Sequence, residues 1–288
     1  MSYATHDAGL GTAYERLAVY GLLERWFRQR PIKTALEGPV DAMAGIPGLH
    51  LVGLARLGCE VTVALPSAEA LETVRRVYTL LGVADRLRTV EASPERLPEG
   101  EFDLVLTYNA LPVVSAWQGY LARVVQRARK YLVVSVTNPS SYGVYIRKAQ
   151  RLTEAAREPE LFDHAATQPC VLEPVLESFG AVVEHEYLDC PWWPDLFVPT
   201  GERLLEASLK RIPVLGRRIG ERLAAGSEDP YRYGPESFPL FAGVEGHEAL
   251  VAALKRHPVF DGDRPHALKT LFGHHHAYLV EKAGARAK

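Results

Sequence analysis

The chain has 288 residues, of which 47% are hydrophobic, so it can bury a large core. Its 33 basic and 35 acidic residues nearly cancel, which excludes attraction of the whole molecule to nucleic acid or to an anionic membrane. The three cysteines, Cys59, Cys170 and Cys190, form no C-x-x-C pair, as is typical of a reducing compartment. The sequence shows no signal-peptide pattern and no membrane-spanning apolar run, so we expect a cytoplasmic protein that binds no nucleic acid.

The first predicted element is an amphipathic helix. Residues 13–28 place Leu17, Tyr20 and Leu23 at helical spacing. We therefore expect residues 1–30 to form an N-terminal helical segment that precedes the core of the protein.

From residue 31 onward, strand-like and helix-like segments alternate. The strand-like runs are 33–38, 60–65, 87–92, 102–109, 131–138, 181–189 and 275–282. The helical stretches are 47–57, 68–81, 116–130 and 170–179. The second, fourth and fifth runs are almost continuously apolar, which indicates a parallel sheet covered by helices on both faces. This pattern predicts an α/β fold with a doubly wound, Rossmann-like sheet.

Residues 191–270 interrupt this alternation. They begin with the aromatic stretch PWWPDLFVP and contain a basic amphipathic stretch, 203–223. We predict that they form an inserted cap over the carboxyl edge of the sheet, where open α/β sheets bind ligands. The α/β core then comprises 31–190 and 271–288. Because the last strand follows so long an excursion, no short crossover dictates its direction, and it can enter the sheet antiparallel.

Five segments of this core follow one another along the chain. They are TALEG, GCEVTVALPS, VEASPERLPEGEFDLVLTYNAL, YLARVVQRARKYLVVSVTNP and VLEPVLESFGAVVEHEYLDCPWWPD. Read together, they resemble the successive motifs of class I S-adenosylmethionine-dependent methyltransferases, over about residues 30–190 and 271–283. The resemblance implies a seven-stranded mixed sheet with an antiparallel last strand. It also implies S-adenosylmethionine as cofactor and S-adenosylhomocysteine as product.

The resemblance places the methionine end of the cofactor beside the first strand. Glu37 occupies a position where the family often has a carboxylate that engages the methionine amino group, and Gly38 would let the backbone approach the ligand. The alternative is that Glu37 only caps the following loop. The loop EGPVDAMAGIPG, which includes Gly45, is about five residues longer than the compact glycine loop of the family. We therefore expect a different backbone path, with Asp41 supplying a further carboxylate.

Two positions that bind the nucleoside in the family lack an acidic residue here. Leu65 occupies the place of the acid that accepts hydrogen bonds from both ribose hydroxyls, and Ser67 can replace only one of these bonds. Ser93 occupies the place of an acid near the adenine. We therefore expect weaker cofactor binding than is usual in the family, and tighter binding when Leu65 is replaced by an acidic residue.

The segment after the fourth predicted strand is close to the family pattern. It consists of Asn109, Ala110 and Leu111, which the resemblance places against the cofactor. Asn109 either faces the cleft or closes a turn by bonding its own backbone, as asparagine often does.

No motif marks a catalytic side chain. His164 and His185 are candidate general bases because neutral imidazole titrates near working pH, although each can equally be a core or loop histidine. Tyr14, on the N-terminal helix, can line the sulfonium end of the cofactor with its ring face or simply pack against the core. In-line attack on an activated methyl group mainly requires alignment in a dry pocket, so a base is dispensable.

The run His274, His275 and His276 raises the question of a metal site. Neighbouring side chains of a strand alternate between its faces, so only His274 and His276 can share one face. A zinc site usually needs three or four ligands. We therefore expect no metal at this run.

The inserted segment suggests the kind of acceptor. Trp192, Trp193, Phe197 and Tyr231 would give an aromatic lining suited to an apolar molecule, and the basic stretch would allow at most peripheral contact with a membrane. We therefore expect a small-molecule or lipid-like acceptor, while nothing in the sequence indicates the oligomeric state. The alternative function is a non-catalytic binding or scaffold protein that keeps the fold with a degenerate donor site.

Overall fold

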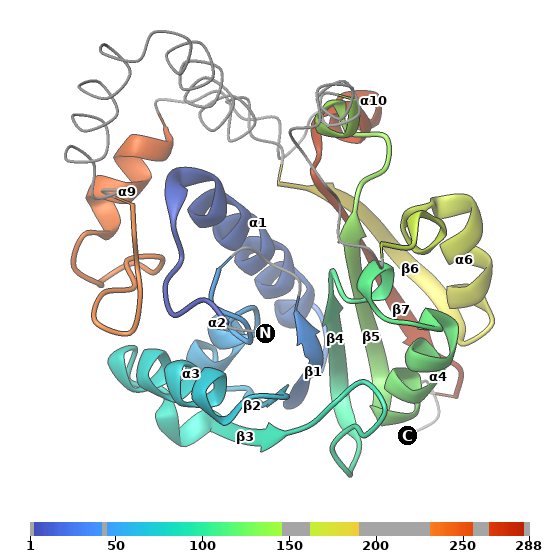
Figure 1. Cartoon of the computed structure of the whole chain (residues 1–288), viewed down its shortest axis with the longest axis horizontal. Coiled ribbons are helices and arrows are strands. Elements are labelled where there is room, and N and C mark those ends of the chain that lie inside the picture. The colour runs from blue at the N-terminus through green and yellow to red at the C-terminus, as the bar shows by residue number, and fades with distance from the viewer. Residues whose placement is uncertain (1–2, 42–44, 146–161, 190–230, 256–264, 285–288) are drawn as a thin grey trace, which may run out of the picture.

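A computed structural model describes residues 3–41, 45–145, 162–189, 231–255 and 265–284 of the chain. Within these ranges, a single seven-stranded sheet forms the centre of the molecule, in the order β3-β2-β1-β4-β5-β7-β6 (Figure 1). The strands are β1 (Thr34–Asp41), β2 (Glu60–Leu65), β3 (Leu87–Glu91), β4 (Phe102–Tyr108), β5 (Ala128–Thr137), β6 (Gly180–Leu188) and β7 (His275–Lys282). Each strand-like run of the sequence becomes one of these strands.

The sheet is mixed, with parallel and antiparallel pairs of strands. The strands β1 to β5 pair in parallel, whereas β7 is antiparallel to both β5 and β6. The pairing of β5 with β7 runs from Tyr131↔Glu281 to Thr137↔His275, so His275 lies at the edge where β5 ends. This confirms the doubly wound mixed sheet with an antiparallel last strand.

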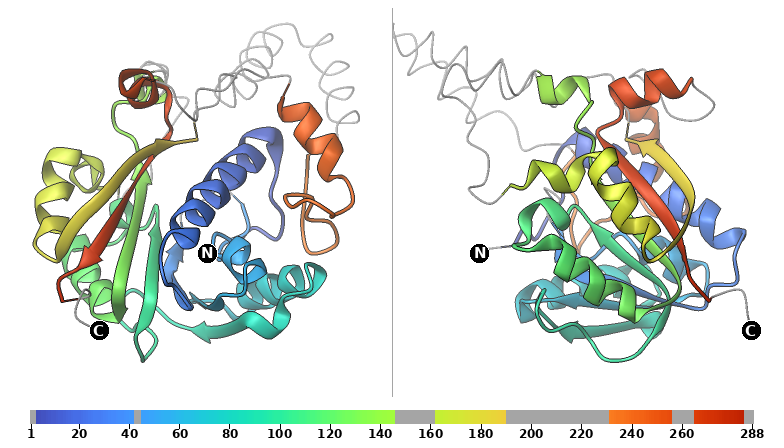
Figure 2. Two further views of the ribbon diagram at one scale, coloured as in Figure 1. Left: turned by 180° about the vertical axis from the view of Figure 1, so that it is seen from behind. Right: turned by 90° about the vertical axis from the view of Figure 1, so that its right-hand side faces the viewer.

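Helices cover both faces of the sheet. Figures 1 and 2 show α1, α2 and α3 on one face and α4 and α6 on the other. The helices are α1 (Gly9–Arg28), α2 (Val52–Arg56), α3 (Ala68–Leu80), α4 (Trp117–Arg127), α6 (Pro169–Glu177), α9 (His247–Leu254) and α10 (His266–Phe272). Short 3-10 helices are η1 (Ala84–Arg86), η2 (Leu111–Val113) and η3 (His164–Thr167). In the described ranges, no helix combines the length and apolarity that crossing a membrane requires.

The core consists of two apolar clusters, one on each face of the sheet. Val61, Val63 and Leu65 of β2 belong to the cluster under α1, α2 and α3, while Leu36 and Val105 belong to the cluster under α4 and α6. Because both faces are covered, every residue of β4 is buried. The continuous apolar run of the sequence therefore has its physical cause in this double packing.

Part of the predicted cap packs on the helices of one face. The ring of Phe241 stacks on Tyr20 of α1 with 4.9 Å between ring centroids, and the guanidinium of Arg56 lies 4.6 Å above the same ring. Tyr231 is half-buried against the same core cluster. Residues 191–230 and 256–264 of the predicted cap, with the basic stretch 203–223, Trp192, Trp193 and Phe197, fall outside the described residues.

Candidate functional site

The carboxylate of Glu37, on β1, forms hydrogen bonds with the loop that follows this strand. Oε1 accepts a hydrogen bond from the amide of His50 at 3.2 Å and lies 2.7 Å from Nδ1 of its ring, while Oε2 accepts from the amide of Leu51 at 3.1 Å. These amides precede α2, where the first N–H groups of a helix have no partner within it. Both oxygens of Glu37 are thus used by the chain, which is the capping role that the sequence left open.

Asp41 and His50 complete this arrangement. Oδ2 of Asp41 accepts a hydrogen bond from the amide of Gly48 at 3.1 Å and lies 3.5 Å from Nδ1 of His50. His50 is fully buried and stacks on Tyr108 at the end of β4, with 4.0 Å between ring centroids. Burial opposes a charge on this ring, but Asp41 and Glu37 outweigh it and raise the pKa of His50. We call Glu37, Asp41 and His50 the loop cluster.

We expect the stability lost in His50→Gln to be greater near pH 6 than near pH 9. The pKa of His50 is higher in the folded than in the unfolded protein, so its stabilisation is complete below the unfolded value of about 6.5 and is lost as pH rises through the folded value. Urea unfolding of wild type and variant at both pH values measures the difference. A loss that is equal or greater at the higher pH would contradict this assignment.

A buried ion pair anchors the other side of the loop. Arg16 of α1 donates from Nε to Oδ2 of Asp7 at 2.7 Å and from Nη2 to Oδ1 at 3.0 Å. The same two side chains bond the backbone of Ile46, since its amide donates to Asp7 at 2.7 Å and its carbonyl accepts from Arg16. A Cβ at Gly45 would lie 2.1 Å from Asp7, so packing requires glycine there.

Two further glycines are needed for space. Gly48 has a φ of +75°, and a Cβ on it would lie 2.6 Å from Cγ1 of Val63. A Cβ on Gly38 would lie 3.0 Å from the hydroxyl of Tyr120 on α4. The space beside Gly38 is therefore filled by the chain itself. Gly48, absent from the sequence-based candidates, is the loop glycine with the strongest conformational requirement.

We expect Gly48→Ala to lower the free energy of unfolding by about 2–4 kcal/mol, because a left-handed backbone costs about 1–2 kcal/mol and an overpacked contact about 1–3 kcal/mol. Gly58→Ala is the matched control, since Gly58 has a φ of +94° with nothing within 4 Å of a new Cβ. That control should lose only about 1–2 kcal/mol in the same urea titration. Equal losses in the two variants would show that the contact with Val63 costs nothing.

The positions expected beside the nucleoside serve the chain locally. Leu65 is fully buried in the core at the end of β2. The hydroxyl of Ser67 caps α3 by accepting from the amide of Ala70 at 3.2 Å, and that of Ser93 accepts from the amide of Arg96 at 3.2 Å. A hydroxyl oxygen that accepts an amide can still donate its own hydrogen, so Ser67 keeps one contact to offer a ligand. The hydroxyl of Ser93 already bonds the carboxylate of Glu95.

Asn109 follows β4 with a φ of +49°, a left-handed conformation that asparagine tolerates better than most residues. Its amide nitrogen lies 2.8 Å from Nε2 of His275, so its side chain reaches across to β7. Ala110 and Leu111 are fully buried in the cluster under α4 and α6. Only Asn109 of these three therefore brings a polar side chain to the carboxyl edge.

A second polar group lies beside the loop cluster. Oε1 of Glu15 accepts from the hydroxyl of Tyr108 at 2.6 Å and is 3.7 Å from Nε2 of His275. Asp189, which follows β6, places Oδ2 at 3.3 Å from Nδ1 of His275 and 3.5 Å from Nδ1 of His274. Burial raises the pKa of Glu15; it acts in the same direction on Asp189, but the two histidines outweigh it and lower the pKa of Asp189. We call Glu15, Asp189 and His275 the edge cluster.

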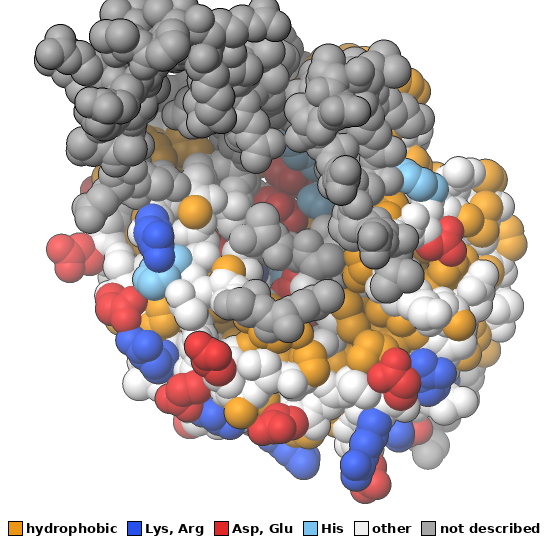
Figure 3. All heavy atoms as spheres, viewed as in Figure 1, with side chains coloured by type: hydrophobic (Ala, Val, Ile, Leu, Met, Phe, Trp, Pro, Cys, Tyr) orange, Lys and Arg blue, Asp and Glu red, His pale blue; other side chains and the backbone are white. Residues whose placement is uncertain are grey.

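Tyr108 joins the two clusters, because its ring stacks on His50 and has its centroid 5.4 Å from that of His275. Figure 3 shows acidic and histidine side chains deep in a hollow of the molecule. The sequence offered no local signal for this group, although Asp189 ends one predicted strand-like run, His275 begins another, and Tyr108 is the next-to-last residue of a third. Glu15 is one of two acidic residues on an amphipathic helix, with Glu24, and could not be singled out.

The two predicted catalytic histidines lie apart from both clusters. His164 is exposed at the start of η3, edge-on to Phe162 with 4.9 Å between ring centroids. His185 on β6 has Nε2 at 3.2 Å from Nδ1 of His276, and burial lowers its pKa. Tyr14 is buried in the core cluster under α1, α2 and α3. Neither histidine joins the loop or edge cluster.

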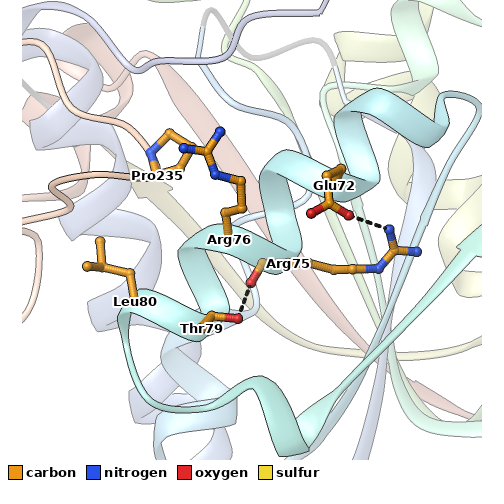
Figure 4. A pocket seen from close by; sticks show the side chains of 6 residues that line it. All are labelled: Glu72, Arg75, Arg76, Thr79, Leu80 and Pro235. Carbon is orange, nitrogen blue, oxygen red and sulfur yellow. Dashed lines mark hydrogen bonds and ion pairs between the residues drawn. The ribbon is translucent and has the colours of Figure 1, made fainter.

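A separate pocket of about 320 Å³ lies on α3, outside both clusters (Figure 4). Its walls are Glu72, Arg75, Arg76, Thr79, Leu80 and Pro235. Arg75 pairs with Glu72 at 3.0 Å, and Arg76 pairs with Glu236. Its charged groups are paired and largely exposed, so this pocket offers no arrangement for catalysis.

No family model and no curated protein matches this sequence. Among solved structures, magnesium protoporphyrin IX methyltransferase (ChlM) from Synechocystis PCC 6803 is similar, with 14% identity over 62% of this chain and 77% of that chain and a TM-score of 0.49. A SAM-dependent methyltransferase from Aquifex aeolicus has 13% identity over 62% of this chain and 87% of that one, with a TM-score of 0.43. The cyclase SpnF has 14% identity over 92% and 79%, with a TM-score of 0.48.

These likenesses carry no conclusion about activity at such identities and TM-scores. The sheet order, with β7 antiparallel between β5 and β6, defines the fold as the Rossmann-like fold of class I S-adenosylmethionine-dependent methyltransferases.

Proposed function

We propose that this protein is an S-adenosylmethionine-dependent methyltransferase that transfers a methyl group in line to a small-molecule or lipid-like acceptor. The observation that carries the proposal is the sheet order, which reverses between β1 and β4. Open α/β sheets bind ligands at the carboxyl edge beside such a reversal. The loop cluster, Tyr108 and Asn109 all lie at this edge.

The charges at this edge suit the proposed cofactor. S-adenosylmethionine brings a methyl group already activated on a positive sulfonium, together with a positive amino group. Glu37, Asp41, Glu15 and Asp189 place four carboxylates around His50, Tyr108 and His275. Nε2 of His50 is fully buried and has no hydrogen-bond partner among the described residues, so it can bond a ligand at the methionine end.

The residues of the chain would then act mainly by positioning and by excluding water. Glu37 holds the loop, and Asp41, Gly45 and Gly48 fix its path beside the methionine end. Ser67 would offer a hydroxyl hydrogen to the nucleoside, and Ser93 would have to give up its bond to Glu95 to do the same. Tyr14 is the candidate for a ring contact with the sulfonium.

The proposal can be tested by comparing ligands that share the nucleoside but differ at the methionine end. We expect S-adenosylhomocysteine to raise the melting temperature of the purified protein more than methylthioadenosine does, because ligands that bind only the folded state stabilise it according to their affinity. Equal increases of the melting temperature with the two compounds would show that the protein does not bind the methionine end. They would favour another adenine-containing ligand. No shift with either compound would argue against the cofactor itself.

One observation favours the alternative of a non-catalytic protein on this fold. Both oxygens of Glu37 are used by the loop, and Leu65 presents no polar group to a ribose. Under this alternative, the purified protein binds neither S-adenosylmethionine nor S-adenosylhomocysteine. The same melting experiment therefore separates the two functions.

A further inference from the structure

The edge cluster brings together side chains from three distant parts of the chain. Glu15 comes from α1, Asp189 follows β6 and His275 begins β7, and one ligand atom from each lies within 4.8 Å of the others. Their side chains are 15%, 3% and 10% exposed. The cluster is therefore a mostly buried set of two carboxylates and one imidazole.

Among the residues that the structure describes, the carboxylates of this cluster have only histidine and tyrosine partners. In the described ranges, neither Glu15 nor Asp189 forms an ion pair with lysine or arginine; Asp189 faces only His274 and His275. Oδ1 of Asp189 is buried and has no hydrogen-bond partner within the same ranges. A buried carboxylate oxygen without a donor costs free energy that a bound cation would recover.

The two carboxylates of the loop cluster, by contrast, are well supplied with hydrogen-bond donors. There, backbone amides of Gly48, His50 and Leu51 donate to Glu37 and Asp41. In the edge cluster, Tyr108 donates one hydrogen bond to Glu15, and across the described residues no backbone amide donates to either carboxylate. Among the described residues, the edge cluster is therefore the one that lacks backbone donors.

We propose that the edge cluster binds a divalent transition-metal cation through Glu15, Asp189 and a ring nitrogen of His275. The metal would take Nδ1, which lies 3.3 Å from Oδ2 of Asp189. Nε2 would then carry the ring hydrogen, so the side-chain amide of Asn109, 2.8 Å away, would turn over to present its oxygen to that hydrogen. Two carboxylates and one imidazole suit Mn²⁺, Fe²⁺ or Zn²⁺. Three protein ligands leave coordination positions open for water or another ligand.

The surroundings of the cluster support this assignment. Ligands of bound metals are usually oriented by further hydrogen bonds, and here Tyr108 bonds Glu15 while Asn109 holds the ring of His275. His276 points elsewhere, since its Nε2 lies 3.0 Å from the carbonyl of Thr167. A metal at His275 departs from the expectation of no metal at the histidine run. That expectation weighed only ligands within the run, whereas the other proposed ligands, Glu15 and Asp189, come from distant parts of the chain.

Metal titration of the full-length protein after treatment with a chelator tests the proposal without any cofactor. We expect one equivalent of Mn²⁺ or Zn²⁺ to bind, and Asp189→Asn and His275→Gln each to weaken binding by about tenfold or more. Asp41→Asn in the loop cluster and His185→Gln on β6 are matched controls that should leave binding unchanged. No stoichiometric binding by wild type, or a loss in Asp41→Asn without one in Asp189→Asn, would overturn the proposal.

A second readout needs no variant. Paramagnetic Mn²⁺ added to the wild-type protein should broaden the ring proton signals of His275 before those of His164, which is exposed on η3. Broadening that spares His275 would overturn the site even if a metal binds elsewhere. Because neither experiment contains S-adenosylmethionine, failure here leaves the proposed function untouched, and the reverse also holds.

Discussion

Replacing Arg16 with methionine is expected to lower the free energy of unfolding by about 3–5 kcal/mol, since removing one partner of a buried pair leaves the other charge uncompensated. Arg16 and Asp7 are 0% and 1% exposed, and both also bond the backbone of Ile46. Asp7 further pairs through its backbone with Tyr233. The loss should therefore also release the loop after β1.

Arg28→Met on the same helix is the matched control. Arg28 forms an exposed pair with Glu24 one turn away, and such pairs contribute about 0.3–0.5 kcal/mol. Urea unfolding of both variants against wild type gives the two losses directly. A loss in Arg16→Met no greater than in Arg28→Met would show that the buried pair does not hold these segments together.

Leu65→Asp is expected to lower the free energy of unfolding by at least about 4 kcal/mol, because it removes a buried leucine and places a carboxylate in an apolar core. Leu65 is fully buried in the cluster that contains Val63 and Val74. The resemblance alone led to a different expectation for this variant, namely tighter binding of the ribose. The structure gives the physical reason for the difference: the side chain packs inward.

Leu65→Met serves as the control, since a swap that keeps the volume usually costs less than about 1.5 kcal/mol. Thermal and urea unfolding of both variants, followed by titration with S-adenosylhomocysteine, separate stability from binding. An aspartate variant as stable as wild type that also binds this ligand more tightly would restore the expectation drawn from the resemblance.

The sheet could be predicted because its strands carry strong local signals. The strand β4 is buried on both faces and reads as a continuous apolar run, and β7 starts and ends at the predicted residues. The ends of the elements on either side of the loop after β1 were harder to predict. The helix expected over 47–57 is only α2, because residues before Val52 form the loop that bonds Glu37. The strand β1 continues past Gly38 through an irregular pairing with β4.

The candidate site could be predicted only where it follows the order of motifs. Glu37 and Asn109 both lie at the carboxyl edge, as the resemblance implied. The partners of these residues could not be predicted, because the edge cluster joins Glu15, Asp189 and His275 across most of the chain. Only the antiparallel return of β7 beside β5 brings His275 next to Asn109. No local spacing encodes that contact.

Calorimetric titration of the wild-type protein with S-adenosylhomocysteine tests the central claim most directly. We expect one site, with an affinity about one to two powers of ten below that of a site with an acidic ribose contact, since such a pair of hydrogen bonds is absent here. Loss of this binding in Gly48→Ala, with binding retained in Gly58→Ala, would place the ligand beside the loop. The absence of any heat at millimolar ligand, together with an unchanged melting temperature, would contradict the methyltransferase proposal.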